Sequence, residues 1–203
     1  MNTPAPQAQG IAQAPALVIA LAVIDMQNDF VLPGAPACVA GALATVPVIR
    51  RLLDHARAAG WPVLHVYREH RADGSDAEAF RRELFREGRG ICVGGTPGAD
   101  IVPELSPLPG EQRIVKRRFS AFLGTPLDLV LRRLGVSTLV LAGTQYPNCI
   151  RGTAVDALSR DYRVVVVTDA CSAQTEAVAR ANIFDLTNMG VACVPLGELA
   201  GAL

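Results

Sequence analysis

The run Leu17-Val18-Ile19-Ala20-Leu21-Ala22-Val23-Ile24-Asp25 is apolar throughout until its last residue, which carries a carboxylate. An apolar run without alternating polar positions is typical of a strand that is buried on both faces of a parallel sheet. It is too short to cross a membrane, which takes about 20 residues. It also lacks a basic leader, because the first cation of the chain is Arg50, so we expect no signal peptide. The sequence therefore predicts a buried strand over 17–24 that ends at Asp25.

The rest of the chain alternates predicted strands and helices. Further strands are predicted over 61–67, 112–115, 138–142, 163–167 and 191–194, and helices over 46–56, 125–134, 149–160 and 175–188. This order predicts an α/β fold with three layers, α/β/α, around a mostly parallel, doubly wound sheet of about six strands. Residues 1–15 are predicted to be a flexible N-terminal tail and 16–203 a single domain. The connection 68–111 is long and rich in Gly and Pro, and we predict that it is functional or forms a lid.

Composition narrows the class of protein further. The chain has 203 residues, of which 50% are hydrophobic and 19% charged, and its formal net charge is zero. No basic block interleaved with aromatic residues is present, so we expect neither a nucleic-acid partner nor a membrane partner. The five cysteines are dispersed and form no CxxC pair, which is typical of reduced thiols in the cytoplasm. They are Cys38, Cys92, Cys149, Cys171 and Cys193.

Three residues of complementary chemistry follow predicted strands. Asp25 follows the first strand, Lys116 the third, and Cys149 the fourth after a short turn. Carboxyl ends of parallel strands share one edge of the sheet, where such folds place their sites. Lys116 is the single lysine among 19 lysine and arginine residues, which suggests a role that a guanidinium cannot fill. We expect the start of a helix and Lys116 to lower the pKa of Cys149, with Asp25 as the proton acceptor.

Five segments together resemble the isochorismatase-like cysteine hydrolases, in particular their amidohydrolase branch. They are LAVIDMQNDF (21–30), VYREHRADGSD (66–76), VKRRFSAFLGTPLD (115–128), LVLAGTQYPNCIRGTAVDAL (139–158) and YRVVVVTDACSA (162–173). The resemblance implies that Asp25, Lys116 and Cys149 form a catalytic triad that cleaves C–N bonds of small amides, carbamoyl compounds or ureides through a thioester. It implies a cis peptide between Thr144 and Gln145, and an oxyanion hole formed by the backbone N–H groups of Gln145 and Cys149. It also implies no cofactor, and a homodimer or homotetramer.

The chain departs from the family pattern in two places, at the residues that bind a metal in the nicotinamidase branch and at the residues expected around the substrate. The nicotinamidase branch has a metal-binding Asp/His cluster, whereas this chain offers only His65 and His70 close together, so we expect no metal. Tyr146 stands where family members commonly have Thr. We expect Gln27, Gln145 and Asn148 to hydrogen-bond the substrate. We expect an aromatic wall made of Phe30, Phe119, Phe122 and Tyr146.

Alternatives stay open at this point. Cys149 would also suit a non-catalytic or redox-sensing domain, which needs the thiol but not the proton shuttle of Asp25. A dyad of Cys149 with His65 is a further possibility, although His65 lies inside its predicted strand. A nucleotide-binding module is disfavoured because no Gly-rich turn follows the first strand. Three arginines, Arg68, Arg117 and Arg151, are expected to be solvated cations or members of ion pairs, with binding of a substrate carboxylate as the alternative.

Overall fold

Six parallel strands form the centre of the protein, which is described over residues 17–203 by a computed structural model. The strands are β1 (Ile19–Ile24), β2 (Val63–Arg68), β3 (Gln112–Lys116), β4 (Thr138–Thr144), β5 (Arg163–Ser172) and β6 (Ala192–Val194). Their spatial order is β3-β2-β1-β4-β5-β6, and every neighbouring pair is parallel. The order reverses direction at β1, so the sheet is doubly wound and β1 lies at its middle.

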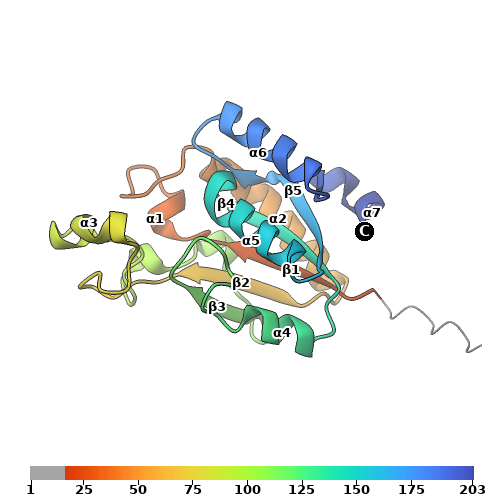
Figure 1. The fold of residues 1–203 in the computed structure, drawn as a ribbon, viewed down its shortest axis with the longest axis horizontal. Coiled ribbons are helices and arrows are strands. Elements are labelled where there is room, and N and C mark those ends of the chain that lie inside the picture. Colours follow the sequence, from red (N-terminus) through yellow and green to blue (C-terminus); the bar gives the residue numbers. More distant parts are fainter. Residues whose placement is uncertain (1–16) are drawn as a thin grey trace, which may run out of the picture.

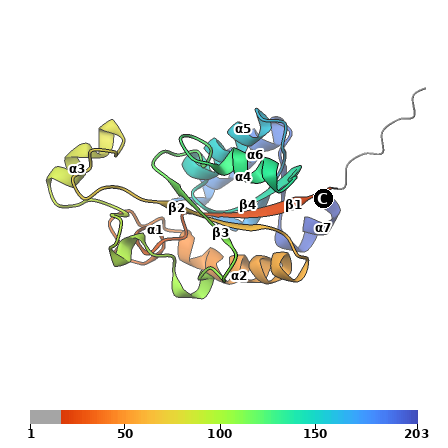
Figure 2. The ribbon, with the colours of Figure 1, turned by 90° about the horizontal axis from the view of Figure 1, so that it is seen from below.

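Helices cover both faces of this sheet (Figure 1, Figure 2). α2 (Ala42–Ala58) and α7 (Leu199–Ala202) pack on one face, whereas α4 (Leu127–Arg133), α5 (Arg151–Leu158) and α6 (Glu176–Asn188) pack on the other. Successive residues of a strand point to opposite faces, so Leu21 and Val23 join the α2 core while Ala22 and Ile24 join the other. The predicted three-layer α/β/α fold with a parallel sheet is confirmed.

Several predicted boundaries shift where the chain approaches the site. β4 runs two residues further than predicted, to Thr144, and Lys116 is the last residue of β3 rather than the residue after it. The helix predicted to begin at Cys149 begins at Arg151, because residues Tyr146–Ile150 form a π-helical turn that contains Cys149. The predicted tail 1–15 lies outside the described residues.

The segment between β2 and β3 makes a long excursion with little regular structure. It contains 3-10 turns at Ala79–Arg81, Pro97–Ala99 and Pro103–Leu105 and the short helix α3 (Arg82–Arg86), which protrudes from the body of the protein (Figure 1). Its second half returns to α1 (Asn28–Val31), which directly follows β1, through a bridge between Gln27 and Ile101. Within 17–203, no helix combines the length and the apolar character that crossing a bilayer requires.

Candidate active site

Lys116, Asp25 and Cys149 meet at the carboxyl edge of the sheet. The Lys116 ammonium donates a hydrogen bond of 2.7 Å to Asp25 Oδ2, lies 3.4 Å from Cys149 Sγ, and donates to the backbone oxygen of Arg118 at 3.2 Å. β2 separates β3 from β1, so only a long side chain on β3 can reach Asp25. All three side chains are buried from solvent. The structure thus brings together the three residues that the sequence placed at this edge.

The backbone of Asp25 adopts the left-handed region, with φ of 54°. Aspartate is among the few residues other than glycine that enter this region readily, although it costs about 1 kcal/mol. The conformation is held from both sides. The Asp25 N–H donates to Val66 O at 2.9 Å, and on β4 Gly143 lies so close that a Cβ there would sit 2.1 Å from Ile24 O.

The two carboxylate oxygens of Asp25 have different environments. Oδ2 accepts the hydrogen bond from Lys116, whereas Oδ1 is buried and has no hydrogen-bond partner within residues 17–203. A buried carboxylate oxygen without a donor leaves part of its desolvation uncompensated. Oδ1 is therefore the atom of this site that is open to receive a proton.

The environment of Cys149 differs from the sequence prediction. Burial raises the pKa of the Cys149 thiol, the negative charge of Asp25 raises it further, and Lys116 and Arg68 act in the opposite direction without prevailing. The predicted lowering of this pKa is therefore wrong, because the helix start and the cation were weighed without the loss of water around the sulfur. The resting thiol holds its proton beside a carboxylate that can accept it.

Arg68 lies at the site, where the sequence predicts only a solvated cation or a member of an ion pair, with binding of a substrate carboxylate as the alternative. It is the last residue of β2, pairs in register with Lys116 of β3, and is fully buried, so the expected ion pair is present, with Glu78, but the alternative of a solvated surface position is wrong. Its Nη1 donates to Glu78 at 2.6 Å, and its Nη2 lies 3.6 Å from Cys149 Sγ. Burial by itself would lower the pKa of Arg68, but the acidic groups around it, first the Cys149 thiol in its ionised form and then Asp25 and Glu78, raise it above its ordinary value. Arg68 directly follows a predicted strand, so the rule that selected Asp25 and Lys116 would have selected it as well.

The other two arginines behave as the sequence predicts. Arg117 pairs with Asp76 at 2.6 Å and Arg151 pairs with Asp185 at 2.6 Å. Both ion pairs are partly open to solvent, where such pairs contribute little to stability.

A small pocket opens onto the Cys149 sulfur. The cavity is about 10 Å³, which is room for about one water molecule. It receives Arg81 from the excursion between β2 and β3, so this connection reaches the site, and its functional role stays a prediction. Its lining residues are Asp25, Phe30, Val39, Arg68, Arg81, Phe119, Thr144, Gln145, Asn148 and Cys149.

Four of the seven residues expected at the substrate line this pocket: Phe30, Phe119, Gln145 and Asn148. The peptide between Thr144 and Gln145 is cis, as the family resemblance implies. The three other residues do not line the pocket. The amide group of Gln27 is buried and bonded to the backbone of Arg68 and Ala99, so it ties the end of β1 to the end of β2 and to the excursion.

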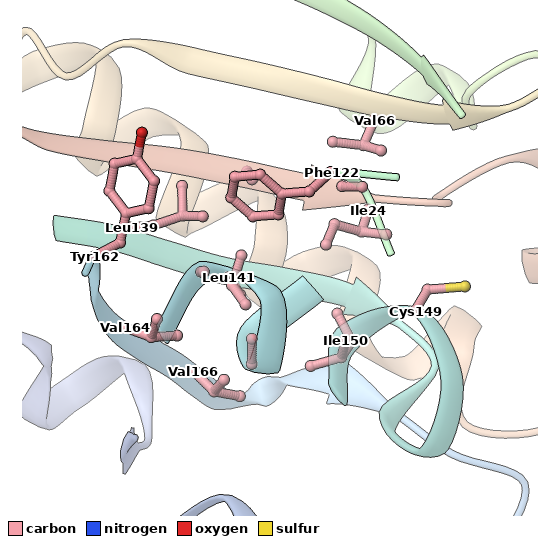
Figure 3. Packing of buried hydrophobic residues seen from close by; sticks show 14 of the residues in the cluster. Ile24, Val66, Phe122, Leu139, Leu141, Cys149, Ile150, Tyr162, Val164 and Val166 are labelled. Atoms are coloured by element: carbon pink, nitrogen blue, oxygen red, sulfur yellow. The ribbon is translucent and has the colours of Figure 1, made fainter. Parts of the chain in front are cut away.

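Phe122 and Tyr146 lie in the core instead of the substrate wall. The ring of Phe122 packs against Tyr162, with centroids 6.0 Å apart, in the cluster between the sheet and α4 and α5 (Figure 3). Tyr146 is buried, and its hydroxyl donates to Thr168 O at 3.0 Å. In Figure 3 the Cys149 sulfur points away from this apolar cluster. Aromatic character alone did not distinguish a pocket wall from core packing.

His65 lies on the α2 side of the sheet, away from Cys149. Its Nε2 is 2.8 Å from Glu111 Oε2, which also accepts from the Leu108 N–H at 2.8 Å, and Arg57 Nε donates to the other carboxylate oxygen, Glu111 Oε1, at 2.7 Å. Burial lowers the pKa of His65. Although burial opposes it, these hydrogen bonds lower the pKa of Glu111 to about 2. His65 is thus part of a structural ion-pair network, and the alternative of a Cys149–His65 dyad is wrong.

His70 lies near carboxylates but in no metal-binding set. Its Nδ1 is 3.4 Å from Asp76 and its Nε2 is 3.8 Å from Glu78. Throughout the described part of the chain, no group of three or more His, Cys, Asp or Glu side chains is arranged to hold a metal ion.

A doubly wound parallel sheet that gathers a cysteine, an ammonium and a carboxylate at its carboxyl edge defines a class of α/β proteins with a candidate cysteine nucleophile. The family model described as Isochorismatase domain matches residues 19–196. The chain therefore belongs to the isochorismatase family, as its sequence segments indicate.

Three comparisons show where the chain stands among its relatives. A crystal structure of an isochorismatase family protein from Desulfovibrio vulgaris is 66% identical, superposes with a TM-score of 0.90, and the match covers 91% of this chain and 97% of that one. Maleamate amidohydrolase of Pseudomonas putida is 33% identical over 87% of this chain and 81% of its own length. An Arabidopsis thaliana protein named "probable inactive nicotinamidase" is 45% identical over 88% of this chain and 93% of its own. Relatives of this chain thus include amidohydrolases.

Proposed function

We propose that this protein is a cysteine amidohydrolase that cleaves a C–N bond of a small amide, carbamoyl compound or ureide, with Asp25, Lys116 and Cys149 as its catalytic triad. The observation that carries the proposal is the position of one ammonium, which lies 2.7 Å from Asp25 Oδ2 and 3.4 Å from Cys149 Sγ. An amidohydrolase among the relatives supports the same class of reaction.

In the first half of the reaction, Asp25 takes the proton of the Cys149 thiol as the sulfur attacks the amide carbonyl carbon. The raised pKa of the thiol favours this order, since the proton leaves only when a substrate accepts the electron pair of the sulfur. Lys116 stabilises the negative charge as it passes between carboxylate and sulfur. The backbone N–H groups of Gln145 and Cys149, which border the pocket, would hold the oxyanion.

In the second half, the tetrahedral intermediate collapses and its C–N bond breaks. Asp25 returns the proton to the departing nitrogen, which leaves as ammonia or an amine, and an acyl group remains on Cys149 as a thioester. Asp25 then accepts a proton from a water molecule that attacks the thioester carbonyl. As the C–S bond breaks, Asp25 returns this proton to the Cys149 sulfur, and the product acid and the free thiol are released. No step of this sequence requires a cofactor.

A second candidate is a non-catalytic domain or a redox sensor that uses the Cys149 thiol. One observation favours a non-catalytic domain: the name of the Arabidopsis relative contains the word inactive. A sensor needs only the thiol, whereas the hydrolase also needs Asp25. Loss of turnover in Asp25→Asn with retained reactivity toward peroxide would separate the two roles.

A substrate panel tests the proposed function. Biuret, N-carbamoyl amino acids, nicotinamide and maleamate are incubated with the wild type and with Cys149→Ala, and ammonia release is measured. We expect release from at least one compound by the wild type and from none by the variant. Ammonia release by Cys149→Ala at the wild-type rate, or a silent wild type whose Cys149 is readily oxidised, would contradict the proposal.

A further inference from the structure

Two arginines reach the pocket at Cys149 in addition to the triad. Arg68 is fully buried at the end of β2, and its Nη2 lies 3.6 Å from the Cys149 sulfur. Arg81 enters the same pocket from the excursion between β2 and β3, and 16% of its side chain is exposed. An arginine beside a cysteine nucleophile is not required for hydrolysis of a neutral amide, so these cations call for an explanation.

Three cations beside Cys149 pair with only two carboxylates. Lys116, Arg68 and Arg81 contribute three positive charges, and Asp25 and Glu78 contribute two negative charges. Cys149 holds its proton, since burial raises its pKa. Arg68 and Arg81 thus share the single carboxylate of Glu78, and a buried cation with an incomplete partner is costly.

Arg81 is the cation whose charge is least satisfied. Glu78 Oε1 accepts a hydrogen bond of 2.6 Å from Arg68. Glu78 Oε2 lies 3.4 Å from Arg81 Nε without forming a hydrogen bond. Over residues 17–203 the Arg81 guanidinium donates no hydrogen bond, and its nearest aromatic contact is Phe80, 4.9 Å away and largely exposed. Burial and the positive charge of Arg68 lower the pKa of Arg81. The guanidinium thus presents unused N–H donors and a net positive field to the pocket.

We propose that the substrate of this site carries a carboxylate close to the scissile carbonyl, and that Arg81 binds this carboxylate. The planar fork of a guanidinium matches the two oxygens of a carboxylate, and such charge-assisted pairs are among the strongest hydrogen bonds in proteins. Arg68 adds to the positive charge beside the pocket, but its guanidinium already contacts Glu78 through Nη1 and the Cys149 sulfur through Nη2. The inference rests on the proposed function and narrows its substrates to anionic amides or ureides.

Alkylation of Cys149 tests the charge preference without any substrate. The same Cys149 thiolate attacks the CH2 carbon of iodoacetate and of iodoacetamide and displaces iodide from both. The two reagents differ only in carboxylate versus amide, so the ratio of their rates cancels changes in the pKa of the thiol. Adduct formation at Cys149 is followed by peptide mass spectrometry for the wild type, Arg81→Gln, Arg81→Lys and the control Arg117→Gln. Arg117 is a suitable control because it pairs with Asp76 outside the pocket. N-acetylcysteine gives the ratio of an isolated thiol.

We expect the iodoacetate-to-iodoacetamide ratio of wild-type Cys149 to exceed that of N-acetylcysteine. Arg81→Gln is expected to lower this ratio by about tenfold or more, which corresponds to about 1.4 kcal/mol, while Arg81→Lys keeps part of it and Arg117→Gln keeps all of it. A wild-type ratio at or below that of N-acetylcysteine overturns the proposal, even if the Arg81 variants do not fold. An equal fall in Arg81→Gln and Arg117→Gln also overturns it.

Turnover of a matched pair completes the test. Succinamate and 4-oxopentanamide share the primary amide and the two methylene groups next to it, and a methyl ketone replaces the carboxylate in the second. We expect the wild type to prefer succinamate, and Arg81→Gln to lose that preference through a raised KM. A wild type that hydrolyses neutral amides better than anionic ones refutes the carboxylate site and leaves the hydrolase intact. Absence of turnover with every amide refutes the proposed function, while the alkylation ratio still decides whether the pocket selects anions.

Discussion

Replacement of Lys116 by arginine keeps the positive charge and changes only its shape. The ammonium of Lys116 has three partners in three directions, namely Asp25 Oδ2, Cys149 Sγ and the backbone oxygen of Arg118. The side chain is fully buried, and the Arg68 guanidinium already occupies the space beside the sulfur at 3.6 Å. A second planar guanidinium has no room to keep all three contacts.

Loss of one charge-assisted hydrogen bond is worth about 1.5–3 kcal/mol. We therefore expect Lys116→Arg to lower kcat/KM by about 100-fold, which corresponds to about 2.7 kcal/mol. Lys116 does not line the pocket, so the loss should fall on kcat rather than on KM. Steady-state ammonia release measures both constants, and the rate of Cys149 alkylation by iodoacetamide gives a readout that needs no turnover.

A control on the same strand separates shape from charge. Arg113 is exposed and pairs with Glu69 at 2.9 Å, so Arg113→Lys should leave kcat/KM and the unfolding temperature unchanged. The reasoning is refuted if Lys116→Arg folds like the wild type and keeps kcat/KM within about threefold. In that case the single lysine would not be part of the catalytic machinery.

Four further outcomes follow from the same contacts. Cys149→Ala should abolish turnover without lowering the unfolding temperature by more than a few degrees. In the wild type, an acyl adduct trapped with substrate should map to Cys149 and to no other cysteine. Activity should survive dialysis against a chelator, and activity that is lost to the chelator and restored by zinc would contradict the metal-free triad. Iodoacetamide should inactivate the enzyme, and substrate should protect it. Glu111→Gln should lower the free energy of unfolding at pH 7 by up to about 3 kcal/mol. Because the folded-state pKa of Glu111 is about 2, below the ordinary 4.5, the difference from wild type should shrink as the pH falls from 4.5 toward 2, as checked by urea titrations across that range. Gly143→Ala should lower the free energy of unfolding by about 3 kcal/mol or more, because the added Cβ would lie 2.1 Å from Ile24 O. Gly34 also has a positive φ but nothing within 4 Å of an added Cβ, so Gly34→Ala should lower it by only about 1 kcal/mol.

The layers of the fold, and the edge of the sheet at which Asp25, Lys116 and Cys149 lie, could be predicted from the sequence alone. Apolar runs without alternation identify strands buried on both faces, and the carboxyl ends of parallel strands converge whatever the details of packing. That rule was enough to place Asp25, Lys116 and Cys149 within reach of one another, and the structure joins them through a single ammonium.

Which side chains face the pocket, and which charged groups are paired there, could not be predicted without the packing of distant segments. Phe119 and Phe122 stand three residues apart in one segment, yet the first lines the pocket and the second packs in the core. Arg68 and Arg117 are both arginines beside predicted strands, yet one is buried at the sulfur and the other is paired near the surface. The sign of the pKa shift of Cys149 was also beyond the sequence, because burial depends on atoms brought from distant segments and here outweighs the nearby cations. Periodicity fixes the direction of a side chain relative to its own strand or helix, whereas desolvation and charge balance depend on every chain segment that packs around it.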